Sequence, residues 1–422
     1  MCSEYWAALI VLGFAGCSPA AAQGSSPGDS GAPSGVKLSV VYDGAAFANA
    51  KGGVRTGSTY TSNLNLQLDV DLGRIVGWPD TIVYLDGVSL QGGLPSSLVG
   101  DAQGVSSISA PNAVKLYEGW IQKNFSHNQV SVLAGLYDLN SEFYRLQSAG
   151  LFLNSSFGMG PEFSQSGVEG PSVFPDTALG VRIALKPVED IVIRTAMLDG
   201  VPLDRPNGNR GAFERGDGLL IVAEVAFLDR PPLEGRRPSQ RFRVGRQAML
   251  AEYNTKLAIG GWHYTAAFDD LSETQADGKP VQHRGSSGFY ALVDRLLYKS
   301  PDHPDQRLTG FLQVGIGDNR VNRFGSYLGA GLTVTGPFEA RSTDEIGLGL
   351  AYARNGSHYT RAQTAQGLPV ENAEKSIELT YLMQLNSWLA LQPDVQYIIN
   401  PNTQIPALSN ALAVQLRFEV MF

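Results

Sequence analysis

Apolar and polar residues alternate strictly in the C-terminal segment, from Leu412 to Phe422. Every second residue of this segment is apolar, and the positions between them include Gln415, Arg417 and Glu419. A period of two predicts a β-strand with one apolar face and one polar face. In a soluble sandwich the apolar face would cover a core, whereas in an outer-membrane barrel it meets lipid and the polar face lines a lumen. A single strand fits either arrangement, so the recurrence of the pattern decides between them.

Strand-like segments continue from about Val36 to the end of the chain. In residues 62–72 five aliphatic side chains share one side, and three amides and two carboxylates share the other. Further strand-like segments, many separated by turns bearing Gly, Pro, Asn or Asp, are 81–85, 114–123, 130–137, 178–185, 191–197, 219–227, 251–268, 289–297, 308–316, 327–334, 345–353, 376–385 and 389–399. The total of roughly fourteen to sixteen strands lies within the range known for bacterial barrels. We therefore predict an all-β fold, a single transmembrane antiparallel β-barrel over residues 36–422.

The composition argues mainly against a soluble enzyme, and it fits strands, tight turns and long loops. Only 17% of the residues are charged, and 48 of the 422 residues are Gly, whereas globular chains average roughly 25% charged residues and about 7% Gly. Beyond the N-terminus no apolar run approaches the ~20 residues that a membrane-spanning helix needs. A closed barrel is then the available way to span lipid, because an open sheet edge finds no hydrogen-bond partners there. The net charge of -8 gives no reason to expect nucleic acid as a partner.

The N-terminus has the features of an export signal. Residues 7–15 form a short apolar core, and three alanines at 20–22 supply the small residues of a cleavage site. We therefore predict a signal peptide over residues 1–22 and a flexible Gly, Ser and Pro-rich leader over residues 23–35. Residues 1–6 contain no Lys or Arg, so the true start could lie upstream.

Both cysteines of the chain, Cys2 and Cys17, lie within the predicted signal. Cleavage near Ala22 would leave a mature chain without a thiol, so neither a disulfide nor a cysteine metal site would be possible. A competing interpretation uses residues 14–17, Phe-Ala-Gly-Cys, which resemble a lipoprotein box and would place a lipid on Cys17. Cleavage near Ala22 is the favoured interpretation of the two.

A set of short segments follows a distinctive order and spacing over residues 116–422. These segments are 116–120 (LYEGW), 134–143 (AGLYDLNSEF), 151–158 (LFLNSSFG), 254–265 (NTKLAIGGWHYT), 336–341 (GPFEAR) with Asp344, 377–381 (IELTY) and 391–397 (LQPDVQY). Together they resemble the carbohydrate-selective outer-membrane porins of the OprB family. The resemblance implies a sixteen-stranded barrel that passes sugars such as glucose across the outer membrane.

A channel of this kind needs no catalytic group. It needs a water-filled constriction whose side chains replace part of a solute's hydration and still let the solute leave. For a sugar we expect polar and charged side chains on inward positions, with aromatic faces against the C–H surface. Successive side chains of a strand point to opposite faces, so the residues between the apolar ones are predicted to point inward. They are Arg182, Arg194, Glu378, Asp394, Gln396, Gln415, Arg417 and Glu419. Most inward residues of a wide barrel only line its water-filled wall. Each of these eight residues is therefore a candidate for the constriction and no more than that.

The segment from Tyr137 to Gly160 is a stronger candidate for the constriction. It follows a predicted strand, and loops of its length without secondary structure are commonly functional. Its polar residues include Asp138, Asn140, Glu142 and Arg145, and aromatic residues lie among them. We expect this loop to fold into the bore and narrow it. The alternatives are an ordinary extracellular loop and a loop whose aromatic side chains pack on the barrel wall.

The stretch from Arg230 to Arg246 is rich in Arg and Pro. Its prolines predict a loop rather than a strand interior. Its charge could serve an anion funnel or a site for lipopolysaccharide phosphates. Most clusters of this kind are, however, solvated loop charge.

The motifs of common enzymes are missing from the sequence. The five histidines show no His-Glu-x-x-His spacing, and no Gly-x-Ser-x-Gly motif lies between a predicted strand and a predicted helix. Glu378 and Asp394 could in principle pair for glycoside hydrolysis, but the sequence gives no separation for them. We therefore expect no catalytic residue, no cofactor and no metal.

The sequence thus predicts an integral channel of the bacterial outer membrane, exported through a cleaved signal peptide. It would serve passive diffusion of small neutral, glucose-like sugars into the periplasm. The alternative is a general or anion-leaning diffusion porin on the same barrel, and an outer-membrane barrel hydrolase is a remote alternative. The other expected partners are outer-membrane lipid and lipopolysaccharide, with the chain as a monomer or a homotrimer.

Overall fold

The computed structural model describes residues 35–203, 211–229, 253–303, 305–401 and 408–422. The predicted signal peptide, the leader up to residue 34 and the stretch from Arg230 to Arg246 lie outside the described residues. None of the helices in the described ranges is long and apolar enough to cross a bilayer.

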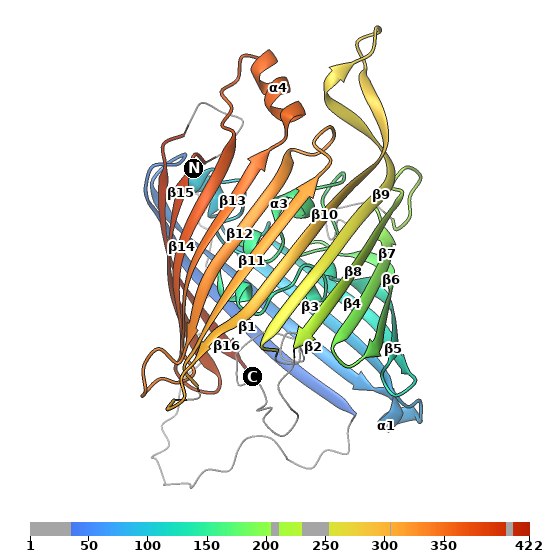
Figure 1. Ribbon diagram of the computed structural model, residues 1–422, viewed down its shortest axis with the longest axis vertical. Coiled ribbons are helices and arrows are strands. Elements are labelled where there is room, and N and C mark those ends of the chain that lie inside the picture. Colours follow the sequence, from blue (N-terminus) through green and yellow to red (C-terminus); the bar gives the residue numbers. More distant parts are fainter. Residues whose placement is uncertain (1–34, 204–210, 230–252, 304, 402–407) are drawn as a thin grey trace, which may run out of the picture. The chain divides into compact units, whose positions relative to one another are not determined.

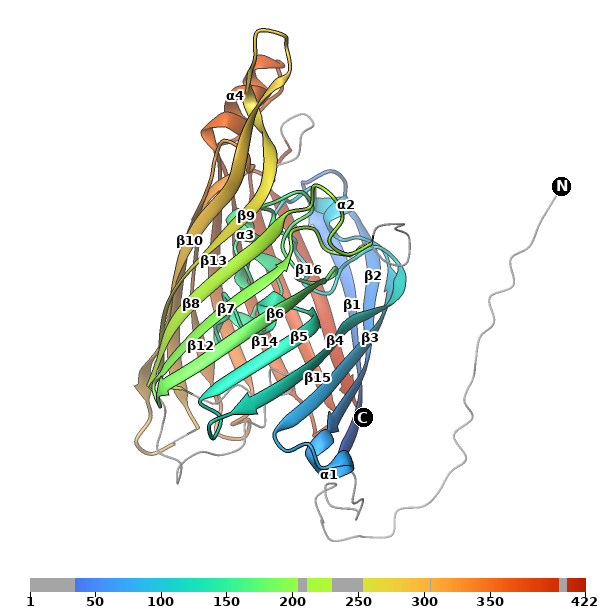
Figure 2. The same cartoon turned by 90° about the vertical axis from the view of Figure 1, so that its right-hand side faces the viewer.

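The described part of the chain forms one closed barrel of sixteen antiparallel strands (Figures 1 and 2). The strands are β1 (Val36–Lys51), β2 (Gly57–Asp71), β3 (Thr81–Gly92), β4 (Ala113–Phe125), β5 (Val130–Tyr137), β6 (Ala178–Val188), β7 (Ile191–Asp199), β8 (Leu219–Asp229), β9 (Thr255–Thr274), β10 (Pro280–Lys299), β11 (Arg307–Gly317), β12 (Phe324–Thr335), β13 (Glu345–Asn355), β14 (Ala373–Gln384), β15 (Leu389–Ile399) and β16 (Ala411–Met421). Each strand pairs with its neighbours in the sequence. The prediction of a single all-β, sixteen-stranded barrel is confirmed.

The barrel closes where β1 meets β16. Val41 lies opposite Met421 and Asn49 lies opposite Ala413. The backbone amide of Val40 also donates to the carbonyl oxygen of Phe422 at 3.1 Å. Closure leaves no open strand edge, which is what a hydrocarbon environment without hydrogen-bond partners requires.

The apolar face of the strands points outward. On β16, Val414 is 42% exposed and Leu416 is 45% exposed, whereas Gln415 between them is 3% exposed. The same alternation runs along β8, where Val225 is exposed and Glu224 is buried. The exposed apolar side chains therefore form the surface that meets lipid, and the polar side chains point into the lumen.

The two ends of the barrel differ in the length of their connections. Where β1 starts and β16 ends, the shortest connections are 126–129, 189–190 and 385–388. The longest connections that lie wholly within the described residues, at the opposite end, are 93–112, 138–177 and 356–372. Short periplasmic turns and long extracellular loops are typical of outer-membrane barrels, so the second end corresponds to the extracellular side.

Strands β9 and β10 are 20 residues long each, about twice the roughly 9–11 residues that cross a bilayer. Their hairpin projects beyond the neighbouring strands (Figure 1). The short helix α4 (Ser357–Ala365) contacts it through His358 and Asp270. The sequence segments 251–268 and 289–297 covered only the membrane-spanning part of this hairpin, because its distal part is polar. The shorter helices are α1 (Leu72–Val76), α2 (Ser96–Val99) and α3 (Pro161–Ser164).

Strand β1 is not among the alternating segments found in the sequence. Its inward positions carry Val41, Ala45 and Phe47, all buried, and its outward positions include Gly44 and Ala46. Small outward residues in the second half of β1, and inward apolar residues that alternate with the buried Asp43 and Asn49, blur the amphipathic signal, although β1 pairs with both β2 and β16.

A charged residue on the outer face should destabilise the barrel in lipid. Leu66, near the middle of β2, is 52% exposed. We expect Leu66→Arg to lower the free energy of unfolding by about 2–4 kcal/mol, because a guanidinium near the bilayer midplane is poorly solvated. Denaturant titration in lipid vesicles, followed by tryptophan fluorescence, measures this change. Leu66→Phe should leave stability nearly unchanged, and equal effects of both variants would contradict a lipid-facing Leu66.

Candidate channel constriction

The long connection between β5 and β6, residues 138–177, lies inside the ring of strands (Figures 1 and 2). We call it the inner loop. It is built from short turns, namely η1 (Leu139–Ser141), η2 (Ala149–Leu151), η3 (Ser155–Phe157) and α3. The expectation that the segment 137–160 folds into the bore agrees with this position, and the loop extends 17 residues further than that segment, to Thr177.

A buried carboxylate on β14 holds the middle of the inner loop. The backbone amides of Leu153 and Asn154 donate to the two carboxylate oxygens of Glu378, at 2.5 and 3.0 Å. The side chain of Asn154 also donates to Gln396 on β15 at 3.2 Å. Because Glu378 is 0% exposed, these bonds are shielded from water, which strengthens them.

Two further carboxylates hold the start of the inner loop against the opposite wall. The amide of Tyr144 donates to Glu224 on β8 at 3.0 Å. The amide and hydroxyl of Ser148 donate to Asp294 on β10 at 3.1 and 2.7 Å. Each carboxylate gives a backbone donor the partner that an irregular segment inside a barrel would otherwise lack.

Aromatic packing fills the space between the inner loop and the wall. The ring of Phe152 lies 4.6 Å from that of Phe157 and 5.5 Å from that of Phe311 on β11. A Cβ added at Gly349 on β13 would lie 2.7 Å from the rings of both loop phenylalanines. Glycine at this position therefore permits the close approach of the loop to the wall.

A second connection, residues 93–112, lines the same lumen over β14–β16. The carbonyl oxygen of Val105 accepts hydrogen bonds from the amides of Gln396 and Gln415, at 2.9 and 3.0 Å. The hydroxyls of Ser106 and Ser107 accept from Arg417, at 3.3 and 3.0 Å. This connection also bonds to the inner loop, since the amide of Ser107 donates to the carbonyl oxygen of Leu153 at 2.8 Å.

An open cavity of about 540 Å³ remains between these two connections and the wall formed by β1–β4 and β14–β16. Its lining mixes carboxylates, amides, tyrosines and two arginines. The charged and polar residues that matter below are Asp43, Asn63, Asn65, Gln67, Tyr84, Asp86, Tyr117, Glu118, Asp138, Asn140, Arg145, Arg417 and Glu419.

Five of the residues proposed from the sequence line this cavity: Asp138, Asn140, Arg145, Arg417 and Glu419. Asp138 caps η1 by accepting from the amide of Asn140 at 2.9 Å. The side chain of Asn140 donates to the carbonyl oxygen of Gly158 at 3.0 Å. This bond joins two parts of the inner loop that are 18 residues apart in the sequence. The inner loop and β16 thus bring polar groups of both charges to one space.

Glu142 and Arg182 form an ion pair with a closest separation of 2.7 Å between charged atoms. Arg182 is 1% exposed and also donates to Gln122 at 2.7 Å and to Ser131 at 2.8 Å. Neither residue lines the cavity. The pair fastens the start of the inner loop to β6, because breaking it would leave a buried guanidinium.

Arg194, Glu378 and Gln396 also point inward as proposed, but they lie beneath the inner loop or the 93–112 connection. Arg194 lies 3.5 Å from Glu224, and the other two bind backbone groups. None of the three lines the cavity. Their geometry supports a positioning role for the loops rather than contact with solute.

The alternation of residues in the sequence missed three carboxylates of the cavity, Asp43, Asp86 and Glu118. A β-bulge on β4 accounts for Glu118. Tyr117 is an extra residue at a β-bulge, because Glu118 lies opposite Asp86 and Leu116 lies opposite Gly87. Tyr117 and Glu118 therefore both face inward although they are adjacent. A bulge shifts the alternation by one residue, so a strict period of two cannot find it.

The geometry defines a class of protein: a closed, lipid-facing barrel with a polar lumen narrowed by an inner loop is a porin-type channel. The model of the family described as "Carbohydrate-selective porin, OprB family" matches residues 55–422. The chain belongs to this family.

Relatives and solved structures agree with this assignment. The chain is 24% identical to Porin B of Pseudomonas aeruginosa, over 92% of this chain and 88% of that protein. It is 25% identical to the putative porin QuiX of Acinetobacter baylyi, over 87% and 85% of the two chains. The fold is similar to a high-pH structure of OprB from Pseudomonas putida, with a TM-score of 0.78, 19% identity and coverage of 92% and 94%.

Removal of the carboxylate beneath the inner loop should loosen the constriction. Glu378→Ala leaves the amides of Leu153 and Asn154 without their acceptor, which costs about 1–3 kcal/mol for each buried donor. We expect a higher and noisier single-channel conductance in planar bilayers. Leu379→Met, on the outward side of the same strand, is the matched control. Equal conductance of the wild type and Glu378→Ala would show that Glu378 does not hold the loop.

Proposed function

We propose that the protein is an outer-membrane channel for passive, selective diffusion of glucose-like sugars, and that solute is sorted in the 540 Å³ cavity. The observation that carries the proposal is the mixed lining of this cavity. A sugar hydroxyl both donates and accepts hydrogen bonds. Carboxylates and amide oxygens accept, arginines and amide nitrogens donate, and the tyrosine rings offer flat apolar surfaces.

The tyrosines of the cavity are held in place by their neighbours. The ring of Tyr84 stacks on that of Trp120 at 5.0 Å, and its hydroxyl donates to Asp86 at 3.4 Å. The indole of Trp120 in turn donates to Glu118 at 3.2 Å. A preorganised aromatic surface beside fixed carboxylates favours binding of a sugar, since little side-chain entropy is lost when it binds.

The charge of the cavity disfavours an anion-leaning channel. Within the described residues its lining holds five carboxylates, Asp43, Asp86, Glu118, Asp138 and Glu419, against two arginines. Carboxylates in a lumen favour cations, whereas anion pores are lined by Arg and Lys. A general porin remains the competitor, and it differs from a sugar channel in having no preference among uncharged solutes of equal size.

The proposal includes the location and assembly of the chain. A signal peptide over residues 1–22 would be removed on export, and the outward apolar faces of the strands would contact outer-membrane lipid and lipopolysaccharide. The channel would work as a monomer or as a homotrimer. Sedimentation in detergent of known partial specific volume distinguishes the two states.

Liposome swelling tests the proposed selectivity. We expect glucose to enter faster than a zwitterionic amino acid of similar size, because the cavity offers hydroxyl-binding groups. Gluconate should enter more slowly than glucose, because the carboxylates repel it. Rates ordered by size alone would identify a general porin. If folded protein gave no swelling with any solute, the channel proposal would fail.

Arg145 provides a test at a single residue of the cavity. We expect Arg145→Ala to weaken glucose binding roughly 5–10-fold, because a hydrogen bond from a charged donor is lost. Selectivity for cations over anions should also increase. Current block by glucose and the reversal potential in a KCl gradient measure these effects. Arg354→Ala removes an exposed arginine of β13 and should change neither quantity; equal behaviour of both variants would remove Arg145 from the solute path.

A further inference from the structure

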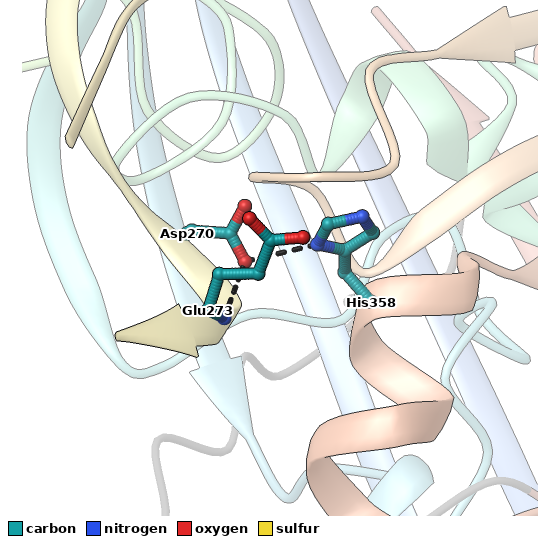
Figure 3. Close-up of side chains that lie close together, drawn as sticks. All are labelled: Asp270, Glu273 and His358. Carbon is teal, nitrogen blue, oxygen red and sulfur yellow. Dashed lines mark hydrogen bonds and ion pairs between the residues drawn. The ribbon is translucent and has the colours of Figure 1, made fainter. Parts of the chain in front are cut away.

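A cluster of possible metal ligands lies at the distal end of the β9–β10 hairpin, away from the cavity. Asp270 and Glu273 come from the end of β9, and His358 comes from the first turn of α4 (Figure 3). One ligand atom from each of the three residues lies within 4.8 Å of the other two. The imidazole of His358 points at the carboxylates, and its Nδ1 lies 2.9 Å from Oδ1 of Asp270.

Asp270 is held rigidly at the centre of the cluster. Its side chain is 0% exposed, and its Oδ1 accepts from the amides of Ser272 and Glu273, both at 2.8 Å. Its other oxygen lies 2.8 Å from Nε2 of His283 on β10. The carboxylate is therefore fixed in position by groups from both strands of the hairpin and from α4.

Asp270 and Glu273 differ in how firmly their side chains are held. This part of β9 extends beyond the membrane-spanning length of the strand, and solvent ions reach the cluster from the exposed side of Glu273. Glu273 completes the group with a side chain that is 55% exposed and only weakly held, 3.8 Å from Arg361.

We propose that Asp270, Glu273 and His358 bind a divalent transition-metal ion of the Zn²⁺ type, which joins α4 to the β9–β10 hairpin. One imidazole and two carboxylates form a donor set that suits Zn²⁺, whereas Ca²⁺ and Mg²⁺ prefer oxygen ligands alone. Three protein ligands leave a fourth position of a tetrahedral site for water.

The geometry requires only a small adjustment. Ligand atoms bound to Zn²⁺ at 2.0–2.2 Å lie roughly 3.4 Å apart in a tetrahedron, and the exposed side chain of Glu273 is free to rotate inward from its position near Arg361. The metal takes the place of the proton that lies between His358 and Asp270, and this proton is transferred to the other ring nitrogen or released to solvent. His283 then acts as the outer partner that orients the Asp270 carboxylate.

The site would link two segments at the extracellular end of the channel. Residues 270–273 and His358 are far apart in sequence, and the connection 356–372 carries α4 over the end of β13. Occupancy would fix α4 against the hairpin. The competing interpretation is a hydrogen-bonded latch without metal, in which the same residues hold α4 through the proton alone.

Direct titration with metal distinguishes the Zn²⁺ site from the hydrogen-bonded latch without metal. Full-length, tag-free protein refolded in detergent is stripped with a chelator and titrated with ZnCl₂ against a chromophoric zinc chelator. We expect one Zn²⁺ for each chain, with no displacement by a hundredfold excess of Mg²⁺ or Ca²⁺. His358→Gln and Glu273→Gln should abolish or strongly weaken this binding, and His283→Gln should weaken it about tenfold.

His263→Gln is the matched control, because His263 lies on the exposed face of β9 and bonds to Ser287 instead. It should bind Zn²⁺ like the wild type. Retained mobility of unheated samples in gel electrophoresis shows that each variant is folded, and Glu273→Gln changes an exposed side chain that the fold does not need. Absence of Zn²⁺ binding in the folded wild type, or binding that survives both His358→Gln and Glu273→Gln, would overturn the proposal.

Discussion

The closed ring of backbone hydrogen bonds is the constraint on which the rest of this structure depends. Hydrocarbon offers no partner to an amide or carbonyl group, so every strand must pair on both sides and β1 must meet β16. Closure places one face of each strand in lipid and the other in the lumen. The polar side chains of sixteen strands are thereby concentrated in one interior, where they become available as partners for other segments.

The inner loop is held in place by hydrogen bonds to these inward polar groups. An irregular backbone inside a barrel needs acceptors for its amides, and Glu224, Asp294 and Glu378 supply them from three directions. Phe152 and its aromatic neighbours then fill one side of the lumen. The space left between the inner loop, the 93–112 connection and the wall of β1–β4 and β14–β16 stays open as the cavity, and polar groups of the loop itself form part of its lining.

Much of the fold could be read from the alternation of residues, and much of the candidate site could not. The alternation identified the inward direction of Arg182 and Glu378, since a side chain's face depends only on its position in a regular strand. It could not show that Glu378 binds loop amides, because the partners are more than 200 residues away. It also missed Glu118, where a bulge breaks the period of two, and the strand β1, whose small outward residues carry no amphipathic signal.

The sequence by itself determined the architecture: alternation, low charge and abundant glycine allow a closed barrel and little else, because local periodicity is a property of neighbouring residues. The resemblance of ordered motifs determined the family. Only the tertiary structure decided which inward residues meet the open cavity and which are used to hold the loops. It also brought His358 to Asp270, 88 residues away. Such contacts depend on where the long connections run across the barrel. Hydrogen bonds and packing between residues far apart in the sequence fix those positions, and no local pattern of residues encodes them.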